Sequence, residues 1–417
     1  MKKKVISIIF IIFILFLFAA CSKGVKTINI LTDEISVYEA ADKFNANHEH
    51  MKVFVDYYNS KNEKENIFRY IQKNKIINSD IIIGIKPPDL IIDPKKFSKI
   101  TKFSKKIGKD EINNLYYPAV DFINDQKGYA TLYNINFPVI IARNDSIPDE
   151  YINKEELSIE DFCNLASSVN ILKPDKKLFE SRLGFIPSIS NLNEIDFYFL
   201  FDSSIVKNNN KLSFDTPETR KAFNLYYEYD DKYNFGSKET INYLSKFNNI
   251  NKKYFLKQKI ISFDFINLSN TALYSKKIYK IFLIKNLKYI STKNKIITIS
   301  KKSINKKEVG MFIDYLYDDD TQITLTKNIM NKIDYYSFLY IPVKKGLIEK
   351  LKSDNIIFVE PNINLDDYIN KLKYVYFINN KIQKKFFEKY NNIKELINKG
   401  VMNKKDLLSQ LSKEINK

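Results

Sequence analysis

The sequence has little of several residue types on which particular chemistries depend. Its 417 residues include two histidines, two cysteines, nine glycines and no tryptophan. His48 and His50 stand together in one polar stretch, so we expect a solvated turn there and no metal site. No Ser-His-Asp order, zinc motif or phosphate-binding glycine loop can be assigned. We therefore expect no catalytic residue, no metal and no cofactor, and we do not expect an enzyme.

The amino terminus accounts for one of the two cysteines. Lys2–Lys4 are followed by an apolar run, Val5–Ala20, that ends in small residues before Cys21. A basic start, a short apolar run and small residues before a cut site are typical of a secretory signal peptide, here residues 1–20. The run is shorter than the roughly 20 residues that a membrane-spanning helix needs. Cys163 is then the only other cysteine, and its helical pattern predicts a small buried hydrophobe.

The stretch Leu17-Phe18-Ala19-Ala20-Cys21 resembles a bacterial lipobox, with Phe18 in the place of the usual leucine. The resemblance implies that Cys21 is diacylated and that residues 21–26 form a lipidated tether. Five or six extended residues span at most about 20 Å, so the folded body would lie close to the membrane. An uncleaved signal anchor is the alternative. Both interpretations predict attachment to the cell membrane, facing the periplasm or the cell exterior.

The strongly basic composition invites a nucleic-acid interpretation. The formal net charge is +18, and subtracting the three signal lysines leaves +15. However, the lysines are dispersed among acidic residues, without the basic stripe or arginine enrichment of a phosphate-tracking surface. We expect a solvated basic surface, with some attraction to anionic lipid headgroups, and no nucleic-acid partner.

The body is long enough for two lobes, because removal of 20 residues from 417 leaves 397. Strands are predicted at 27–31, 52–57 and 80–84, with helices between them. Val37, Ala40, Ala41 and Phe44 recur at helical spacing between the first two strands. Apolar strands that alternate with helices are typical of a parallel sheet covered on both faces.

Later segments predict passages between the lobes. Residues 128–144 read as one or two strands broken at 134–136 and at Pro138, where we place a crossing. The strand at 258–265 could cross back, and the strand at 295–300 could lead across a third time. A helix is expected from Thr216-Pro217, a threonine cap followed by proline at the first helical position. The predicted division is 27–135 plus 266–303 for lobe 1 and 136–265 plus 304–417 for lobe 2.

Several local motifs resemble the extracellular solute-binding protein family of ABC importers, typified by maltose- and other sugar-binding proteins. They include Ser79-Asp80-Ile81-Ile82, Phe214-Asp215-Thr216-Pro217-Glu218 and Ile341-Pro342-Val343-Lys344. The resemblance implies an α/β, two-lobed, periplasmic-binding-protein-like fold, in which crossing strands join two mostly parallel sheets flanked by helices. Departures are Ser203-Ser204 in the place of a Gly-Gly pair, Lys257–Ile261 in the place of a Gly-Lys/Arg-Ala-Ala-Met segment, and the lack of tryptophan.

The resemblance also implies a function and partners. The chain would be a monomer that binds a sugar, oligosaccharide or sugar-phosphate-like solute in an interlobe cleft and delivers it to ABC permease subunits. The departures leave a second interpretation open, a lipoprotein that kept this fold without a ligand and acts as an adhesin or interaction module.

Candidate ligand-binding residues follow from the rule that ligands lie beyond the carboxyl ends of strands in open α/β sheets. Acids and amides would bind hydroxyl groups, and aromatic rings would cover apolar sugar faces. For each residue a structural role, as a helix cap or a packing side chain, is the competing interpretation. The rule selects Asp33, Glu34, Gly84 and Lys86. The predicted crossings add Tyr133, Asn134, Asn136, Phe265 and Asn267, and Tyr335 and Tyr336, ahead of the Ile-Pro-Val segment, are the expected stacking platform in the second lobe.

Overall fold

The structure is a computed structural model of the chain. It describes residues 24–59, 66–73, 78–85, 92–108, 111–170, 183–185, 216–233, 256, 261–287, 294–331, 340–357, 363–372, 388–390, 392–393, 395–397 and 399–416. The predicted signal peptide and Cys21 lie outside these residues, as do Lys86, Tyr335 and Tyr336. Within the described part of the chain, no helix is both long and apolar enough to cross a membrane.

The first lobe contains a six-stranded sheet. Its strands follow the order β2-β1-β3-β10-β4, and β5 also pairs with β10. β10 is antiparallel to each of its partners, whereas β1 is parallel to β2 and β3. The strands are β1 (Lys26–Thr32), β2 (Met51–Tyr57), β3 (Ile81–Ile85), β4 (Phe97–Ser98), β5 (Ala130–Leu132) and β10 (Lys295–Ser300).

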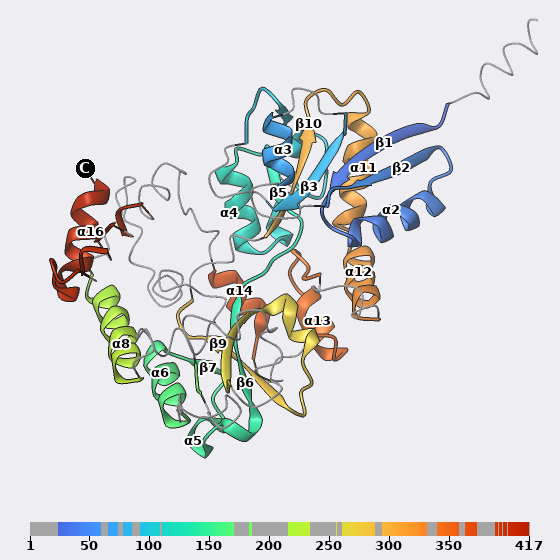
Figure 1. Cartoon of the computed structure of the whole chain (residues 1–417). Coiled ribbons are helices and arrows are strands. Elements are labelled where there is room, and N and C mark those ends of the chain that lie inside the picture. The colour runs from blue at the N-terminus through green and yellow to red at the C-terminus, as the bar shows by residue number, and fades with distance from the viewer. Residues whose placement is uncertain are drawn as a thin grey trace, which may run out of the picture.

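Helices that flank this sheet have the apolar faces that the sequence predicts. The four apolar residues of α2 that recur at helical spacing are all buried. Phe44 of α2 meets Phe312 of α11 edge to face, with ring centroids 5.1 Å apart, so the two helices share one core. Figure 1 shows α2 beside β2 and α11 beside β1. The helices are α2 (Ser36–Asn47), α3 (Ile67–Lys73), α4 (Tyr117–Asp125), α11 (Lys306–Leu316) and α12 (Asp319–Asn331).

The second lobe is built on a four-stranded sheet of order β7-β9-β6-β8. Its core includes the rings of Phe162, Phe185 and Phe265, whose centroids lie 4.7–5.4 Å apart. Cys163 is buried as predicted, and burial raises the pKa of its thiol to about 12. The elements are β6 (Pro138–Arg143), α5 (Asp149–Ile152), β7 (Glu156–Leu157), α6 (Ile159–Ser168), α8 (Pro217–Tyr233), β8 (Phe263–Asn267) and β9 (Tyr279–Ile284).

In each sheet, one described strand runs against the others. β6 is antiparallel to β8 and β9, and β10 is antiparallel to β3 and β5. Both are the first strand after a passage between the lobes. A strand that arrives from the other lobe begins where its neighbours end, so it must run in the opposite direction. The two-lobed α/β prediction is confirmed, with sheets that are mixed for this reason.

The strand pairings also place the boundaries between the lobes at other points in the sequence than we predicted. β9 pairs with β6, so the chain returns to the first lobe between β9 and β10 and not at residue 266. Asp314 of α11 accepts hydrogen bonds from Ser104 Oγ and Lys106 N of the first lobe, at 2.6 and 3.0 Å. α11 therefore belongs to the first lobe, and α12 packs against α2 of the same lobe. The apolar pattern of β9 would suit a strand in either lobe, which is why sequence alone misplaced the boundary.

Helix α14 (Leu365–Lys371) makes hydrogen bonds to both lobes. Its Tyr368 OH donates to Ile284 O of β9 at 2.8 Å. On the other side, Tyr116 OH donates to Asp366, and Asn370 Oδ1 accepts from Tyr117 N at 3.3 Å. Burial, with the neighbouring Asp366 carboxylate, holds the pKa of Tyr116 above its ordinary value, so this hydroxyl stays a donor. α13 (Leu347–Ser353), the short helix η7 (Lys404–Asp406) and α16 (Leu407–Asn416) also lie in the carboxyl-terminal part.

Candidate functional site

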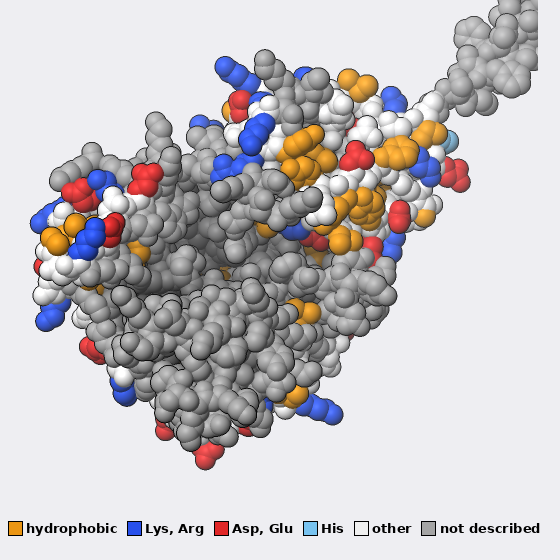
Figure 2. Space-filling view, in the orientation of Figure 1, with side chains coloured by type: hydrophobic (Ala, Val, Ile, Leu, Met, Phe, Trp, Pro, Cys, Tyr) orange, Lys and Arg blue, Asp and Glu red, His pale blue; other side chains and the backbone are white. Residues whose placement is uncertain are grey.

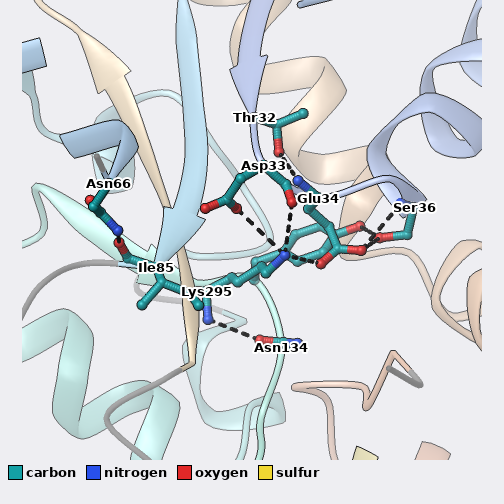
Figure 3. Close-up of polar contacts among 9 residues, drawn as sticks. Thr32, Asp33, Glu34, Ser36, Asn66, Ile85, Asn134 and Lys295 are labelled. Carbon is teal, nitrogen blue, oxygen red and sulfur yellow. Dashed lines mark hydrogen bonds and ion pairs between the residues drawn. The ribbon is translucent and has the colours of Figure 1, made fainter. Parts of the chain in front are cut away.

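The candidate site lies at one edge of the six-stranded sheet. β1, β3 and β5 end there and β10 begins there, because β10 is antiparallel to β3 and β5. We call this edge the crossing edge, since the chain leaves it for the second lobe after β5 and returns to it at β10. Figure 3 shows the side chains that gather at this edge from Thr32 to Ser36 and around Lys295.

Lys295 is the centre of an ionic cluster at the crossing edge. Its Nζ forms an ion pair with the Glu34 carboxylate and lies 3.4 Å from Asp33 Oδ1. The same ammonium group donates to the Asp33 carbonyl oxygen at 3.2 Å. One cation at the start of β10 therefore faces two carboxylates that follow β1, across the intervening strand β3 (Figure 3). The cluster has one negative charge in excess when all three groups are ionised.

Short-range hydrogen bonds fix the position of Glu34. Ser36 donates to Glu34 Oε1 from its backbone N–H, at 3.2 Å, and from its hydroxyl, at 2.9 Å. The Ser36 hydroxyl also lies 2.8 Å from Tyr133 OH, a residue of the first passage. Glu34 N donates to Thr32 Oγ1 at 2.9 Å. The carboxylate is thus aligned by the start of α2 as well as by Lys295.

The position of the Asp33 carboxylate depends on the absence of a side chain at Gly84. A Cβ atom on Gly84 would lie 3.2 Å from Asp33 Oδ1 and 2.6 Å from Ile67 Cγ2. The glycine of β3 therefore gives the carboxylate and α3 room to approach the strand. Next to it, Asn66 Nδ2 donates to Ile85 O at 2.7 Å and fixes the end of β3.

The cluster is largely withdrawn from solvent. The side chains of Asp33, Glu34 and Lys295 are 13%, 17% and 15% exposed. Burial raises the pKa of Asp33, and the Lys295 charge only partly offsets this effect. Burial also acts to raise the pKa of Glu34, but Lys295 and the Ser36 hydrogen bonds outweigh it, so this pKa lies below its ordinary value. Burial alone would lower the pKa of Lys295, yet the two carboxylates raise it.

This arrangement can bind hydroxyl groups. Carboxylate oxygens accept hydrogen bonds, an ammonium group donates them, and bonds to charged partners are stronger than neutral ones. Asn134 adds an amide from the first passage, and its Oδ1 accepts from Lys295 N at 3.1 Å. The crossing edge thus has acceptors and a donor within one small region.

Three neutral polar residues lie together at the edge of the second lobe where β6 begins and β8 ends. We call it the amide edge, defined by Asn136, Asn267 and Ser269. Asn136 Nδ2 donates to Ser269 Oγ at 2.7 Å, and its Oδ1 accepts from Ser269 N at 3.1 Å. Asn267 ends β8 and is partly exposed, and it precedes the short helix η6 (Leu268–Leu273). Residues of this edge can bind a solute only through neutral hydrogen bonds.

The structure brings several predicted site residues together and buries others. Asp33, Glu34, Gly84 and Asn134 meet at the crossing edge, and Asn267 lies at the amide edge. Their role in ligand binding stays a prediction. Lys86, Tyr335 and Tyr336 lie outside the described residues.

The side chains of three predicted site residues are buried inside the protein. Tyr133 is buried, bonded to Ser36 and packed against Tyr340 at 5.0 Å between ring centroids. Phe265 is buried in the aromatic core of the second lobe. Asn136 is buried and holds Ser269. These positions contribute packing and alignment.

Sequence reasoning missed Lys295 and an aromatic pair. Lys295 opens β10, and only the antiparallel direction of that strand brings it to the crossing edge. Tyr58 follows β2 with its N–H bonded to Thr32 O at 2.7 Å, and its ring lies 5.1 Å from that of Tyr70. The Tyr57-Tyr58 pair after an apolar strand was an available signal for an aromatic surface at this edge.

Comparisons with known proteins were made by sequence and by structure. No protein-family model matches the sequence, and a search of curated proteins finds no match. Solved structures do match. The sugar-binding protein MalE from Xanthomonas citri has a TM-score of 0.67 at 13% identity, over 94% of this chain and 96% of that one.

Two further structures match over the same share of the chain. An ABC substrate-binding protein from Listeria monocytogenes, in complex with cycloalternan, has a TM-score of 0.60 at 13% identity and is covered over 98% of its length. A maltose/maltodextrin-binding domain from Bdellovibrio bacteriovorus, bound to maltotriose, has a TM-score of 0.58 at 12% identity and 98% coverage. At these identities the likeness establishes the fold, which is that of the two-lobed solute-binding proteins of ABC transporters.

Proposed function

We propose that this chain is a solute-binding protein of an ABC importer and that it binds a sugar or oligosaccharide between its lobes. The fold is shared with proteins whose bound ligands include maltotriose, mannotriose and cycloalternan. The crossing edge would supply charged hydrogen-bonding groups, and the amide edge would supply neutral ones. A carbohydrate presents hydroxyl groups to both.

The observation that carries the proposal is the ionic cluster of Asp33, Glu34 and Lys295. Three ionisable side chains are held with little exposure at the edge where the chain passes between lobes. Withdrawing charges from water is costly unless each is paired, so such a cluster is unusual as a purely structural element. Solute hydroxyl groups would add hydrogen bonds that the protein alone does not provide.

Lobe closure would couple binding to recognition by the importer. In this mechanism a solute that contacts both edges stabilises the closed form, because the open form can offer contacts from one lobe only. Permease subunits would then distinguish closed from open protein. α14 is well placed to bend with this motion, since it is hydrogen-bonded to both lobes.

A thermal-shift screen of the protein tests solute binding. The panel would contain maltotriose, mannobiose, mannotriose, cycloalternan, monosaccharides and sugar phosphates. A solute at 100 times its Kd stabilises a protein by about 2.7 kcal/mol, an easily measured shift. Protein unfolded and refolded to remove any carried ligand serves as the starting material, and a flat response to every carbohydrate would contradict the proposal.

A second function is favoured by the internal pairing of the cluster. Because Lys295 already neutralises one of the two carboxylates, the edge could serve only to join β1 to β10. The chain would then be a ligand-less lipoprotein that acts as an adhesin or interaction module. This function predicts a flat carbohydrate screen together with a fold that loses stability when the cluster is disrupted.

We further propose that Cys21 is diacylated and that the body is held at a membrane, facing the periplasm or cell exterior. Support comes from the lipobox-like ending of the apolar run and from the short segment between Cys21 and β1. Labelling cells with an alkynyl palmitate should modify the wild type and leave Cys21→Ala unlabelled. Equal labelling of both chains would contradict lipidation at this residue.

A further inference from the structure

The edge of the first lobe opposite the crossing edge has a distinct surface. β1, β2 and β3 begin there and β10 ends there. The loop after β10 is fastened to this edge by Asn305 Nδ2, which donates to Thr27 O at 2.8 Å, and by Lys301 N, which donates to Lys96 O at 2.8 Å. Figure 1 shows this loop and the start of β1 at the end of the lobe that points away from the second lobe.

A large aliphatic side chain projects from this edge. Ile304 is 91% exposed, more than any other large hydrophobic residue that the structure describes. Its neighbours Ser303 and Asn305 are buried and partly buried, so the loop is packed while Ile304 points outward. Val25, just before β1, is also exposed, at 52%.

Lysines surround these two apolar side chains. Lys26, Lys95, Lys301, Lys302 and Lys307 are exposed at the same end of the lobe. The nearby acidic residues include Glu49, which is exposed, Asp93 and Glu308, which are partly buried, and Asp80, which is buried. Figure 2 shows basic side chains and isolated apolar ones along this upper margin of the molecule. We call this surface, from Val25 to Lys26 and from Lys301 to Lys307 with Lys95, the anchor-side surface.

The chain before the described residues limits where this surface can lie. Cys21 precedes Val25 by four residues, and four extended residues span at most about 14 Å. If Cys21 is lipidated, Val25 is held within that distance of the lipid headgroups, and the rest of the anchor-side surface lies at the same end of the lobe. Apolar side chains enter the boundary between headgroups and acyl chains, while lysines beside them pair with anionic headgroups.

We propose that the anchor-side surface rests on an anionic bilayer, with Ile304 inserted among the lipids and the surrounding lysines at the headgroups. This inference rests on the lipidation proposed above and is independent of solute binding. β1 separates the two edges, and seven residues at about 3.3 Å each make a strand of roughly 23 Å. The solute site is therefore held clear of the headgroups.

Fluorescence from two labelled positions tests the inference. The lipidated protein is purified with Ile304→Cys or Val401→Cys, labelled with an environment-sensitive dye and reconstituted into vesicles. Val401 is a matched control, since it is also aliphatic, 71% exposed and far along the chain. Cys163 is buried and Cys21 carries the lipid, so neither competes for the dye.

In vesicles that contain phosphatidylglycerol, we expect a blue shift and quenching by lipid-borne quenchers at position 304 and neither at position 401. Lys301→Glu with Lys302→Glu should abolish the shift at 304 while the lipid keeps the protein on the vesicles. A dye at 304 that stays as hydrated as at 401, or a shift that the charge reversal leaves unchanged, would overturn the inference. Protein that does not float with vesicles would overturn its premise, lipidation, and leave the carbohydrate screen unaffected.

Discussion

The two lobes meet through edges of different character. At the crossing edge of the first lobe lie Asp33 and Glu34, which follow β1, and Lys295, which opens β10, three ionisable side chains with little exposure. At the amide edge of the second lobe the grouped side chains are neutral, with Asn136 bonded to Ser269 and Asn267 partly exposed. One lobe therefore presents strong, charge-assisted hydrogen bonds and the other presents weaker neutral ones.

This difference indicates that the two edges would contribute to solute binding at different stages. A solute would bind first to the lobe with the stronger groups, and the neutral edge would add contacts only after closure. Weak closing contacts allow release, because a solute held strongly by both lobes would be delivered slowly. The following predictions test whether the side chains of the crossing edge contribute more to stability and solute affinity than those of the amide edge.

Lys295→Met should have the largest effect on stability. It leaves Asp33 and Glu34 with little exposure and no cation, and breaking a buried ion pair from one side typically costs about 3–5 kcal/mol. Thermal unfolding measures the loss. Lys221→Met is the control, since its pair with Glu160 is more than half exposed and such pairs contribute about 0–1 kcal/mol. A similar small loss in both variants would contradict the dominance of the cluster.

Gly84→Ala should have the second largest effect on stability. The added Cβ would lie 2.6 Å from Ile67 Cγ2 and 3.2 Å from Asp33 Oδ1, and overpacking of this kind costs about 1–3 kcal/mol. Because it also displaces the Asp33 carboxylate, any solute affinity should fall. Gly24→Ala, with no atom within 4 Å of the added Cβ, should leave the melting temperature unchanged. Equal melting temperatures for the two variants would contradict the close approach.

Asn136→Ala tests the amide edge and should lower the stability of the protein by less than Lys295→Met does. It removes two hydrogen bonds to Ser269, each with a typical net contribution of about 1 kcal/mol. Asn144→Ala is the control, because its bonds to the Lys276 and Lys277 carbonyls are exposed to water. A loss for Asn136→Ala that exceeds the loss for Lys295→Met would reverse the comparison of the two edges.

The smallest expected effect is on the pH dependence of the free energy of unfolding. The Glu34 and Asp33 carboxylates contribute to it in opposite directions. The pKa of Glu34 is lowered in the folded protein, so its contribution is present above its ordinary value of 4.5 and is lost as the pH falls through the folded pKa. The pKa of Asp33 is raised, so its contribution is present below its ordinary value of 3.8 and is lost as the pH rises through the folded pKa.

Melting curves across the acid range separate the two contributions. Glu34→Gln should flatten the loss of stability on acidification, whereas Asp33→Asn should steepen it. Identical slopes in both variants would show that the two carboxylates do not differ as their surroundings require.

The fold was largely predictable, and the site was predictable in part. Strand-end acids such as Asp33 and Glu34 follow from one strand and the rule for its carboxyl end. Lys295 could not be found in this way, since its position depends on the direction of β10, which is set by a passage from the other lobe. For Phe265 the sequence could not predict the surroundings, because β8 is buried on both faces and alternation along the strand gives no sign of which side chains face a solute.

Calorimetric titration of the carbohydrate that gives the largest thermal shift tests the central claim most directly. The wild type is compared with Glu34→Gln at the crossing edge and Asn267→Ala at the amide edge. If one solute contacts both lobes, each variant should bind at least about tenfold more weakly, equivalent to about 1.4 kcal/mol. Undiminished affinity in either variant, or no carbohydrate that binds the wild type, would contradict a site shared between the lobes.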